Sequence, residues 1–189
     1  MKILFVSGSF RKQSFNTRLA EMAMKSLENQ AECRLLDYTN VPFFNQDEEI
    51  PVHSPVQEAR DQFLWADGVW FFTPEYNGMI PGPLKNLLDW MSRSIDSTQA
   101  GNTSVLKGRA ACVSGAGGRA AAVHARDQLE TLLKTCKMRV FDQSVGIGLG
   151  WQEFSSDQFA DPAGIEKLLA DQGQAFIDWI NQTRDEAKA

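Results

Sequence analysis

A short stretch near the start of the chain carries residue types that bind anions. Residues 8–19 read GSFRKQSFNTRL, behind the apolar run 2–6 and ahead of apolar positions at helical spacing. Its polar side chains of interest are those of Ser9, Arg11, Ser14 and Asn16. The first turn of a helix presents unpaired N–H groups and about half a positive charge. We therefore expect an anion site here, most simply for a phosphate, to which Arg11 could give two parallel N–H bonds.

The same residues have a plainer interpretation as helix caps, since Ser and Asn commonly cap helices. The stretch lacks the Gly-x-Gly-x-x-Gly pattern of dinucleotide sites and the Gly-Lys-Ser/Thr pattern of nucleoside triphosphate loops. A phosphate monoester held mostly by side-chain hydroxyls suits a mononucleotide. The choice between a cap and a phosphate site therefore depends on the rest of the chain.

Two further loops carry groups that suit a flat heterocycle. Residues 74–83 read PEYNGMIPGP, in which prolines stiffen the loop and glycines let the backbone approach a ligand closely. Backbone N–H and C=O groups could reach the edge of a ring there, with Tyr76 lining the pocket, although a structural turn is the alternative. Residues 114–118 read SGAGG and could bring backbone amides to the same ring, but glycine-rich turns are common.

Five strand–helix repeats are predicted to position these loops. We expect strands at 2–7, 32–36, 68–73, 109–114 and 138–141, and helices at about 15–29, from 54, from 84, 119–135 and 163–183. Ser54 is predicted to cap the second helix, with Pro55 at its first position and Gln57 completing a capping box. Residues 142–160 are expected to be irregular, and residues 184–189 to fray.

Strands that alternate with helices require parallel pairing and right-handed crossovers. The predicted fold is therefore α/β, a doubly wound five-stranded parallel sheet in the order 2-1-3-4-5 with helices on both faces. Residues 1–189 are expected to form one domain. Ligands of such sheets bind at the carboxyl ends of the strands, where the winding reverses. The three loops follow strands one, three and four, so they should meet at that edge.

Composition argues against several other classes of protein. A net charge of −5 without a basic block disfavours nucleic acid as a partner. Apolar stretches are too short for a membrane span, and the first one is too short for a signal peptide. The three cysteines, Cys33, Cys112 and Cys136, are widely spaced, which predicts reduced core thiols in a cytoplasmic protein. With two histidines in the chain, no metal-ligand cluster is expected.

Three motifs in order make the chain similar to a known family. They are Gly8-Ser9-x-Arg11-x-x-Ser14-x-Asn16-x-x-Leu19, then Pro74-Glu75-Tyr76-Asn77, then Pro81-Gly82-x-Leu84-Lys85-Asn86-x-x-Asp89-Trp90. The chain resembles the NADPH-dependent FMN reductase family, which includes bacterial quinone, chromate and azo-dye reductases. The likeness covers nearly the whole chain, and this family is flavodoxin-like.

The resemblance implies FMN as cofactor, with NADPH or NADH as cosubstrate. It implies that the FMN phosphate is bound by Ser9, Arg11, Ser14 and Asn16. It implies that the isoalloxazine ring lies near Pro74, Glu75, Tyr76 and Asn77, and that a third flavin loop contains Ser114, Gly115 and Gly118. No catalytic side chain and no metal are implied, because the flavin performs the hydride chemistry. Glu75 is more simply explained as a hydrogen-bond partner.

The implied activity is an oxidoreductase that passes hydride from NADPH through FMN to small acceptors such as quinones, flavins, chromate or azo compounds, with ping-pong kinetics. Members are typically homodimers or homotetramers with the helix after the third strand at the interface. Here Leu84, Leu88, Trp90 and Met91 exceed what one buried stripe needs, although packing of all four inside one chain is the alternative. A flavodoxin-type electron carrier, a non-catalytic flavin-binding redox module and a regulator without cofactor are the alternatives. Arg11 and the modest net charge argue against the carrier.

Overall fold

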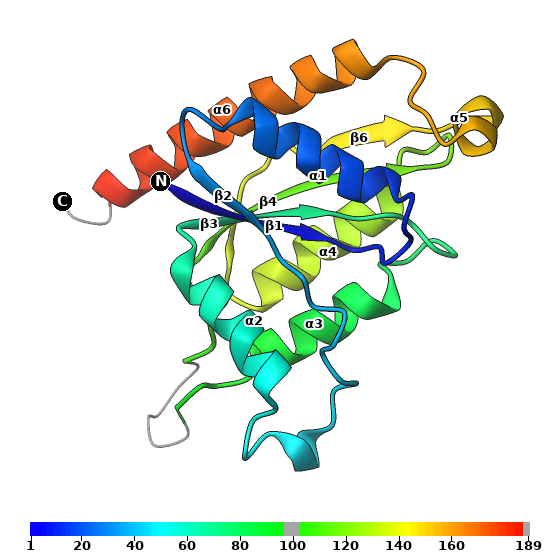
Figure 1. The fold of residues 1–189 in the computed structure, drawn as a ribbon. Coiled ribbons are helices and arrows are strands. Elements are labelled where there is room, and N and C mark those ends of the chain that lie inside the picture. Colours follow the sequence, from blue (N-terminus) through cyan, green and yellow to red (C-terminus); the bar gives the residue numbers. More distant parts are fainter. Residues whose placement is uncertain (97–102, 187–189) are drawn as a thin grey trace.

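The computed structural model describes residues 1–96 and 103–186, which form a parallel sheet with helices on both faces (Figure 1). The strands are β1 (Lys2–Ser7), β2 (Glu32–Leu35), β3 (Gly68–Phe72), β4 (Ala110–Gly117), β5 (Arg139–Val140) and β6 (Val145–Gly148). The helices are α1 (Phe15–Ser26), α2 (Ser54–Trp65), α3 (Gly82–Ser92), α4 (Val123–Thr135), α5 (Trp151–Ser156) and α6 (Pro162–Glu186), with a short 3-10 turn, η1 (Gln46–Glu48).

The sheet has the predicted parallel order β2-β1-β3-β4-β5, and a sixth strand is added to it. The predicted strand 138–141 is interrupted: β5 pairs with Ala110 and Ala111, and β6 pairs with β4 further along. Since β6 supplies that second partner, β4 continues through Gly117 instead of ending at the predicted Ser114. The segment 142–160, expected to be irregular, therefore contains both β6 and α5.

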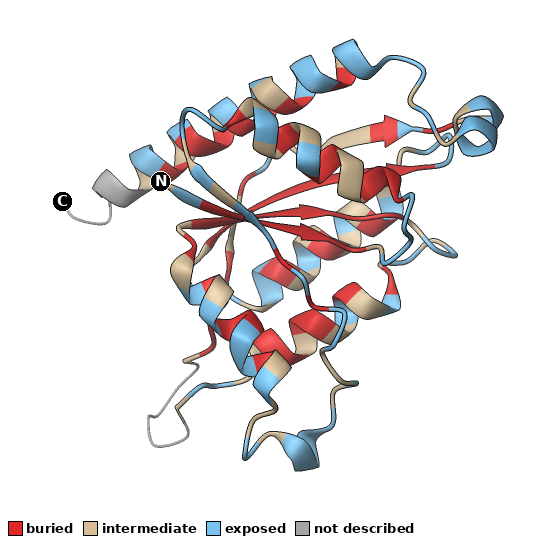
Figure 2. Cartoon of the chain, viewed as in Figure 1, coloured by how far each residue is buried: buried red, intermediate tan, exposed pale blue. Residues whose placement is uncertain are grey.

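Two apolar cores lie on the two faces of the sheet, as Figure 2 shows by the buried strands between partly exposed helices. Side chains alternate along β3, so that Trp70 and Phe72 pack on the α1 and α6 side. Val69 and Phe71 pack on the side of α2, α3 and α4. A strand that is apolar on both faces is typical of the centre of a parallel sheet. Packing on both faces therefore holds the central strands in place, and the loops that follow them begin from a rigid edge of the sheet.

The large apolar residues of α3 lie inside this chain, contrary to expectation. Leu84, Leu88, Trp90 and Met91 are all buried. The loop 40–51 covers the far side of the helix, and Trp90 Nε1 donates a 2.8 Å hydrogen bond to the carbonyl of Pro42. Their number therefore gives no support to an interface at α3, and the dimer or tetramer stays a prediction.

Several predicted helix ends were wrong. Helix α1 ends at Ser26 rather than near 29. Helix α2 has His53 as its N-cap without a side-chain cap bond, and Gln57 Nε2 instead donates to Asp61 Oδ1 at 2.8 Å, so no capping box forms. Helix α4 starts at Val123 rather than 119, because the two residues before it have positive φ angles of 51° and 54°. Helix α6 extends to Glu186, and the predicted fraying beyond it falls on 187–189, outside the described residues.

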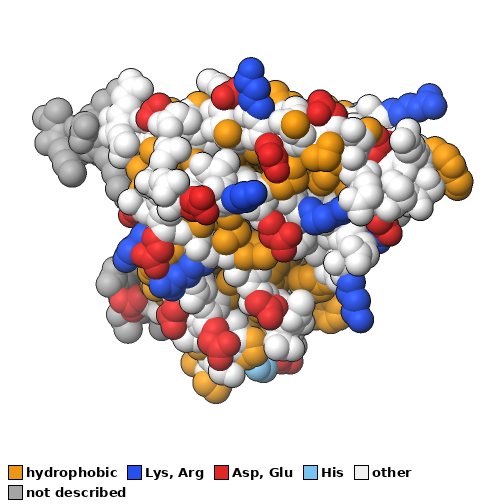
Figure 3. All heavy atoms as spheres, turned by 45° about the horizontal axis from the view of Figure 1, so that its top comes forward, with side chains coloured by type: hydrophobic (Ala, Val, Ile, Leu, Met, Phe, Trp, Pro, Cys, Tyr) orange, Lys and Arg blue, Asp and Glu red, His pale blue; other side chains and the backbone are white. Residues whose placement is uncertain are grey.

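Charged side chains of both signs lie on the surface (Figure 3). On the face that carries α1 and α6, basic and acidic side chains are interspersed (Figure 3). Within the described residues, no helix is both long enough and apolar enough to cross a bilayer.

A buried polar chain crosses the α6 side of the sheet. Trp70 Nε1 donates to Ser114 Oγ at 2.9 Å, and Ser114 Oγ donates to Gln172 Oε1 at 2.7 Å. The amide group of Gln172 in turn donates to the carbonyls of Val113, at 3.1 Å, and Gln143, at 2.7 Å. Gln143 lies in the interruption between β5 and β6. Gln172 therefore supplies donors where the strand ladder is open.

We predict that Gln172→Leu lowers the free energy of unfolding by about 1–3 kcal/mol, because it leaves buried backbone acceptors without a donor. Chemical denaturation of the purified protein measures this. Gln174→Leu is the matched control, because Gln174 is exposed on the same helix. Equal stability of the two variants would contradict the role given to Gln172.

Candidate functional site

The loops after β1, β3 and β4 meet at the carboxyl edge of the sheet and enclose a pocket of about 260 Å³. Helix α5 lies at the same edge (Figure 1). The structure brings these sequence-predicted residues into the pocket wall: Ser9, Arg11, Ser14, Asn16, Pro74, Glu75, Tyr76 and Gly118. Asn77, Ser114 and Gly115 do not line it. The wall also contains residues that were not predicted: Phe15, Ala116, Gly117, Leu149 and Phe154.

The first loop approaches the second very closely at Gly8. The Gly8 N–H donates to the carbonyl of Phe72 at 2.8 Å. A Cβ at this position would lie 3.0 Å from Pro81 Cγ and 3.2 Å from Pro74 Cδ. Glycine therefore allows the β1 loop to lie directly against the β3 loop, and the two loops form one wall.

Two serines of the first loop keep hydroxyl hydrogens available at the start of α1. Ser14 is the N-cap, and its Oγ accepts a 3.2 Å bond from the N–H of Thr17. Ser9 Oγ accepts a 3.3 Å bond from the N–H of Arg11. Each hydroxyl accepts from the backbone, so each can still donate to an anion. The first amides of α1, those of Phe15 and Asn16, have no acceptor within the helix and add further donors.

The Asn16 side chain has a structural role that the sequence did not predict. Its Nδ2 donates to the carbonyl of Ala116 at 3.0 Å, and its Oδ1 accepts from the Ala116 N–H at 2.8 Å. The residue is buried. These two hydrogen bonds fix the start of α1 against the end of β4. Because both polar atoms of the Asn16 side chain are engaged, the group of Asn16 that can still bind an anion is its backbone N–H, at the start of the helix.

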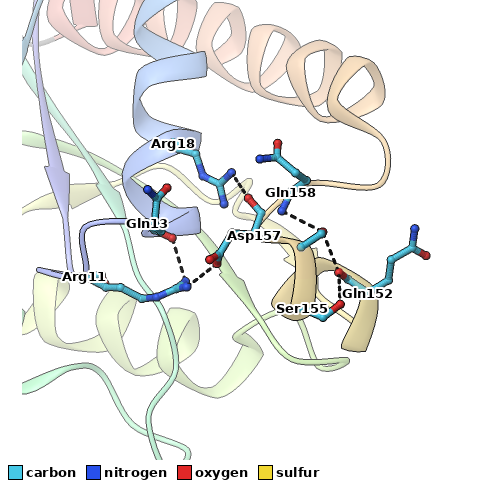
Figure 4. Close-up of polar contacts among 9 residues, drawn as sticks. Arg11, Gln13, Arg18, Gln152, Ser155, Asp157 and Gln158 are labelled. Atoms are coloured by element: carbon cyan, nitrogen blue, oxygen red, sulfur yellow. Dashed lines mark hydrogen bonds and ion pairs between the residues drawn. The ribbon is translucent and has the colours of Figure 1, made fainter.

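Arg11 is held by two acceptors (Figure 4). Its Nη1 donates to the carbonyl of Gln13 at 2.9 Å, and its Nη2 forms an ion pair with Asp157 Oδ1. Asp157 follows α5 and is 146 residues away in sequence. Arg18 Nη1 donates to the main-chain carbonyl of the same residue at 2.5 Å. Sequence reasoning missed Asp157, since no motif surrounds it.

The tip of the β3 loop is a tight hairpin turn. Tyr76 and Met79 exchange two backbone hydrogen bonds of 3.1 Å, and Asn77 and Gly78 between them have φ angles of 55° and 74°. Two consecutive left-handed residues are typical of a type I′ turn, for which Asn-Gly is the preferred sequence. Asn77 therefore has a conformational role and lies outside the pocket wall. The Asn-Gly pair was the sequence feature that could have predicted this.

Two side-chain bonds attach the same loop to α4. Glu75 Oε2 accepts from the N–H of Ala125 at 3.1 Å, in the first turn of α4, which confirms Glu75 as a hydrogen-bond partner. Gln128 Nε2 donates to the carbonyl of Gly78 at 2.9 Å. A carboxylate at a helix N-terminus is also favoured by the helix dipole. Helix α4 thus holds the loop in position. Tyr76 itself is about half exposed, at 51%.

The third predicted loop is largely strand, which corrects the expectation for two residues. Ser114 is buried and bonded to Trp70 and Gln172. Gly115 lies inside β4, where a Cβ would overlap the carbonyl oxygen of Thr73. Both residues lie within the sheet because β6 pairs with β4 at these positions. The pocket instead receives the residues after them: Ala116, Gly117 and Gly118.

The pocket offers no reactive thiol and no metal-ligand cluster among the described residues. All three cysteines are free, and Cys112 is buried. Burial raises the pKa of Cys33 to about 11 and also raises the pKa of Cys112 and Cys136, so these thiols stay protonated at neutral pH. In the ranges 1–96 and 103–186, no group of three metal-ligating side chains occurs. The arrangement therefore suits binding of a phosphorylated ring compound better than nucleophilic or metal chemistry.

Comparisons with known proteins agree with this geometry. A family model described as NADPH-dependent FMN reductase matches residues 1–152. An NAD(P)H-dependent FMN reductase of Pseudomonas aeruginosa is 34% identical over 112 residues, 59% of this chain and 60% of that protein. A quinone reductase of Escherichia coli K12 is 34% identical over 110 residues, 57% of this chain and 58% of that protein. The chain thus spans about three fifths of the length of these two curated relatives.

Solved structures support the fold over a longer span. FerB, a flavoenzyme NAD(P)H:(acceptor) oxidoreductase of Paracoccus denitrificans, has a TM-score of 0.82 at 28% identity, covering 96% of this chain and 97% of FerB. Flavodoxin 1 of Bacillus cereus has a TM-score of 0.63 at 15% identity, covering 94% and 98%. This second likeness concerns the fold alone. The fold is flavodoxin-like, as the strand order predicted.

We predict that Asn16→Ala destabilises the protein by about 1–3 kcal/mol, because it leaves the buried peptide group of Ala116 unpaired. Thermal and urea unfolding measure the change. Gln13→Ala is the control, because Gln13 is exposed in the same loop and bonds Arg11 through its backbone. A variant with unchanged stability would show that the Asn16–Ala116 pair contributes nothing to holding the site.

Proposed function

The chain belongs to the NADPH-dependent FMN reductase family, and on this premise we propose that it transfers hydride from NADPH or NADH through bound FMN to small acceptors. The observation that carries the proposal is the single pocket that joins the anion donors of the β1 loop to the β3 loop. Quinones are the first acceptor class that we propose, because a similar protein is named a quinone reductase. Flavins, chromate and azo compounds are further candidates.

The residues present fit FMN at both ends of the pocket. For the phosphate, the chain supplies the hydroxyls of Ser9 and Ser14, the Arg11 guanidinium and the first amides of α1. For the ring, it supplies the Pro74 loop on one side and the backbone of 116–118 on the other. Outside the lining residues, close backbone approaches at Gly8 and Gly115 leave little room for a side chain. We therefore propose Ser9, Arg11, Ser14, the Asn16 backbone, Pro74, Glu75, Tyr76 and Gly118 as cofactor-binding residues, while Asn77, Ser114 and Gly115, which do not line the pocket, stay predictions.

The mechanism follows from what these walls can do. Bound flavin supplies the hydride chemistry, and the protein supplies binding and orientation. Glu75, the carboxylate of the pocket wall, is engaged with the N–H of Ala125, so we assign it positioning rather than proton transfer. Tyr76 and Phe154 are each about half exposed on the wall. The nicotinamide and the acceptor would use this open side in turn, which predicts ping-pong kinetics.

Domain organisation, location and oligomeric state complete the proposal. We propose that residues 1–189 act as one FMN-binding domain, because the pocket is built from β1 through α5. We propose a cytoplasmic location, supported by three free cysteines in the chain. A homodimer or homotetramer is proposed from the resemblance to the family.

The purified protein, loaded with FMN, tests the activity directly. We expect oxidation of NADPH or NADH that requires an added acceptor, with quinones fastest in a panel that includes free flavin, chromate and an azo dye. Parallel lines in double-reciprocal plots would support the ping-pong order. A yellow protein that oxidises neither nicotinamide with any acceptor would instead indicate an electron carrier or a non-catalytic flavin module.

We predict that Arg11→Ala weakens FMN binding by about 1.5–3 kcal/mol, the usual contribution of a hydrogen bond to a charged group. Titration of the apoprotein, followed by flavin fluorescence, measures the dissociation constant. Lys12→Ala is the matched control: it also removes one exposed positive charge from the loop, but Lys12 does not line this pocket. Equal losses in both variants would point to general electrostatics rather than a phosphate contact.

A further inference from the structure

A carboxylate from a distant segment occupies the guanidinium that the proposed phosphate contact needs. Asp157 Oδ1 pairs with Nη2 of Arg11, and the carbonyl of Gln13 accepts from Nη1 (Figure 4). One N–H group on each terminal nitrogen of Arg11 thus already has an acceptor, out of the five N–H groups of the guanidinium. A bidentate bond to phosphate requires two parallel N–H groups from the same guanidinium.

The position of Asp157 is set by its surroundings rather than by the ion pair alone. Its φ of 53° is left-handed, a conformation that side-chain-bearing residues seldom adopt. Arg18 Nη1 donates to its main-chain carbonyl at 2.5 Å. The Arg18 guanidinium lies over the Phe15 ring, 4.4 Å from its centroid, and within 5.1 Å of the Phe159 ring centroid. Arg18 therefore fixes the backbone from which the carboxylate reaches Arg11.

The ion pair itself is exposed, so it can be exchanged at small cost. The Arg11 and Asp157 side chains are 47% and 37% exposed. Ion pairs at such exposure are screened by water and contribute little to stability. A phosphate dianion bound at Arg11 would face repulsion from the Asp157 carboxylate, whose negative charge already offsets that of the guanidinium. The two acceptors therefore compete for one guanidinium.

We infer that Asp157 is a specificity-determining residue of the flavin site, because its carboxylate competes with the flavin phosphate for Arg11. This inference rests on the function proposed above. Riboflavin has the same ring without the phosphate, so the competition does not affect it. Asp157 thus lowers the preference of the site for FMN over riboflavin, and it favours a flavin that can dissociate and exchange.

Flavin titrations of Asp157→Asn test the inference. Asn has the shape of Asp, tolerates the left-handed backbone and carries no charge. We expect the dissociation constant of FMN to fall about two- to fivefold, the fold-change that corresponds to an exposed ion pair. We expect the dissociation constant of riboflavin to stay unchanged. The melting temperature of the apoprotein verifies that the variant is folded.

Two controls separate a contact through Arg11 from a general effect of charge. Glu153→Gln removes the same charge from α5, but Glu153 bonds the Gly150 N–H instead of Arg11, so FMN affinity should not change. Asp157→Asn in an Arg11→Ala background should give no gain, because the shared guanidinium is gone. A gain that persists in that background, or one that also appears with riboflavin or with Glu153→Gln, would overturn the inference.

The remaining outcomes are also decisive. Weaker FMN binding by Asp157→Asn would show that the carboxylate orients Arg11 toward the phosphate, and unchanged binding would show that it does neither. Either result rejects the competition while leaving the proposed function intact. A wild-type protein that binds neither FMN nor riboflavin would reject the proposed function itself, and the inference with it.

Discussion

The site depends on one interaction above the others, the pair of hydrogen bonds between the Asn16 side chain and the peptide group of Ala116. The loop after β1 and the end of β4 are about a hundred residues apart in sequence, and this pair joins them inside the protein. Because it is buried, its loss would leave a peptide group without partners, which costs more than the bond contributes when made. The pair holds the donor groups of α1 opposite the backbone of 116–118. This attachment therefore gives the pocket one side with the donor groups of α1 and another side made of the backbone of 116–118.

The end of β4 can take part in this pair only because the sheet changes partners along it. β5 pairs with the start of β4, and β6 pairs with its end. Gln172 provides donors where the chain passes from one strand to the other. This arrangement carries β4 through Gly117, so that its last residues reach the pocket wall. The sixth strand is therefore part of what builds the site, although it contributes no polar side chain to it.

Sequence patterns predicted most of the fold, because strands and helices follow from local periodicity. The anion site expected in residues 8–19 stays a prediction; Arg11 and the N-cap Ser14 lie there directly after the end of β1. The loops expected near the flavin ring were predicted less well, because glycine occurs both in loops and in strands where the backbone is closely approached. The glycine-rich pattern predicts a loop at Gly115, yet this residue lies within a strand where the Thr73 carbonyl leaves no room for a side chain. Asn77 serves a hairpin turn. Asp157 was not predictable, because a contact across 146 residues leaves no local pattern.

The two kinds of polar contact at this edge differ in what a change would cost the protein. Asn16 and Gln172 are buried, so their hydrogen bonds stabilise the fold and cannot be exchanged without loss of stability. The Arg11–Asp157 pair is exposed, and breaking it costs the fold little. A cofactor that must enter and leave has to replace contacts of the second kind, because replacing the first kind would unfold the wall it binds to. The burial of each polar pair therefore separates a fixed frame from the exchangeable Arg11–Asp157 contact, and that contact lies where we propose that the phosphate binds.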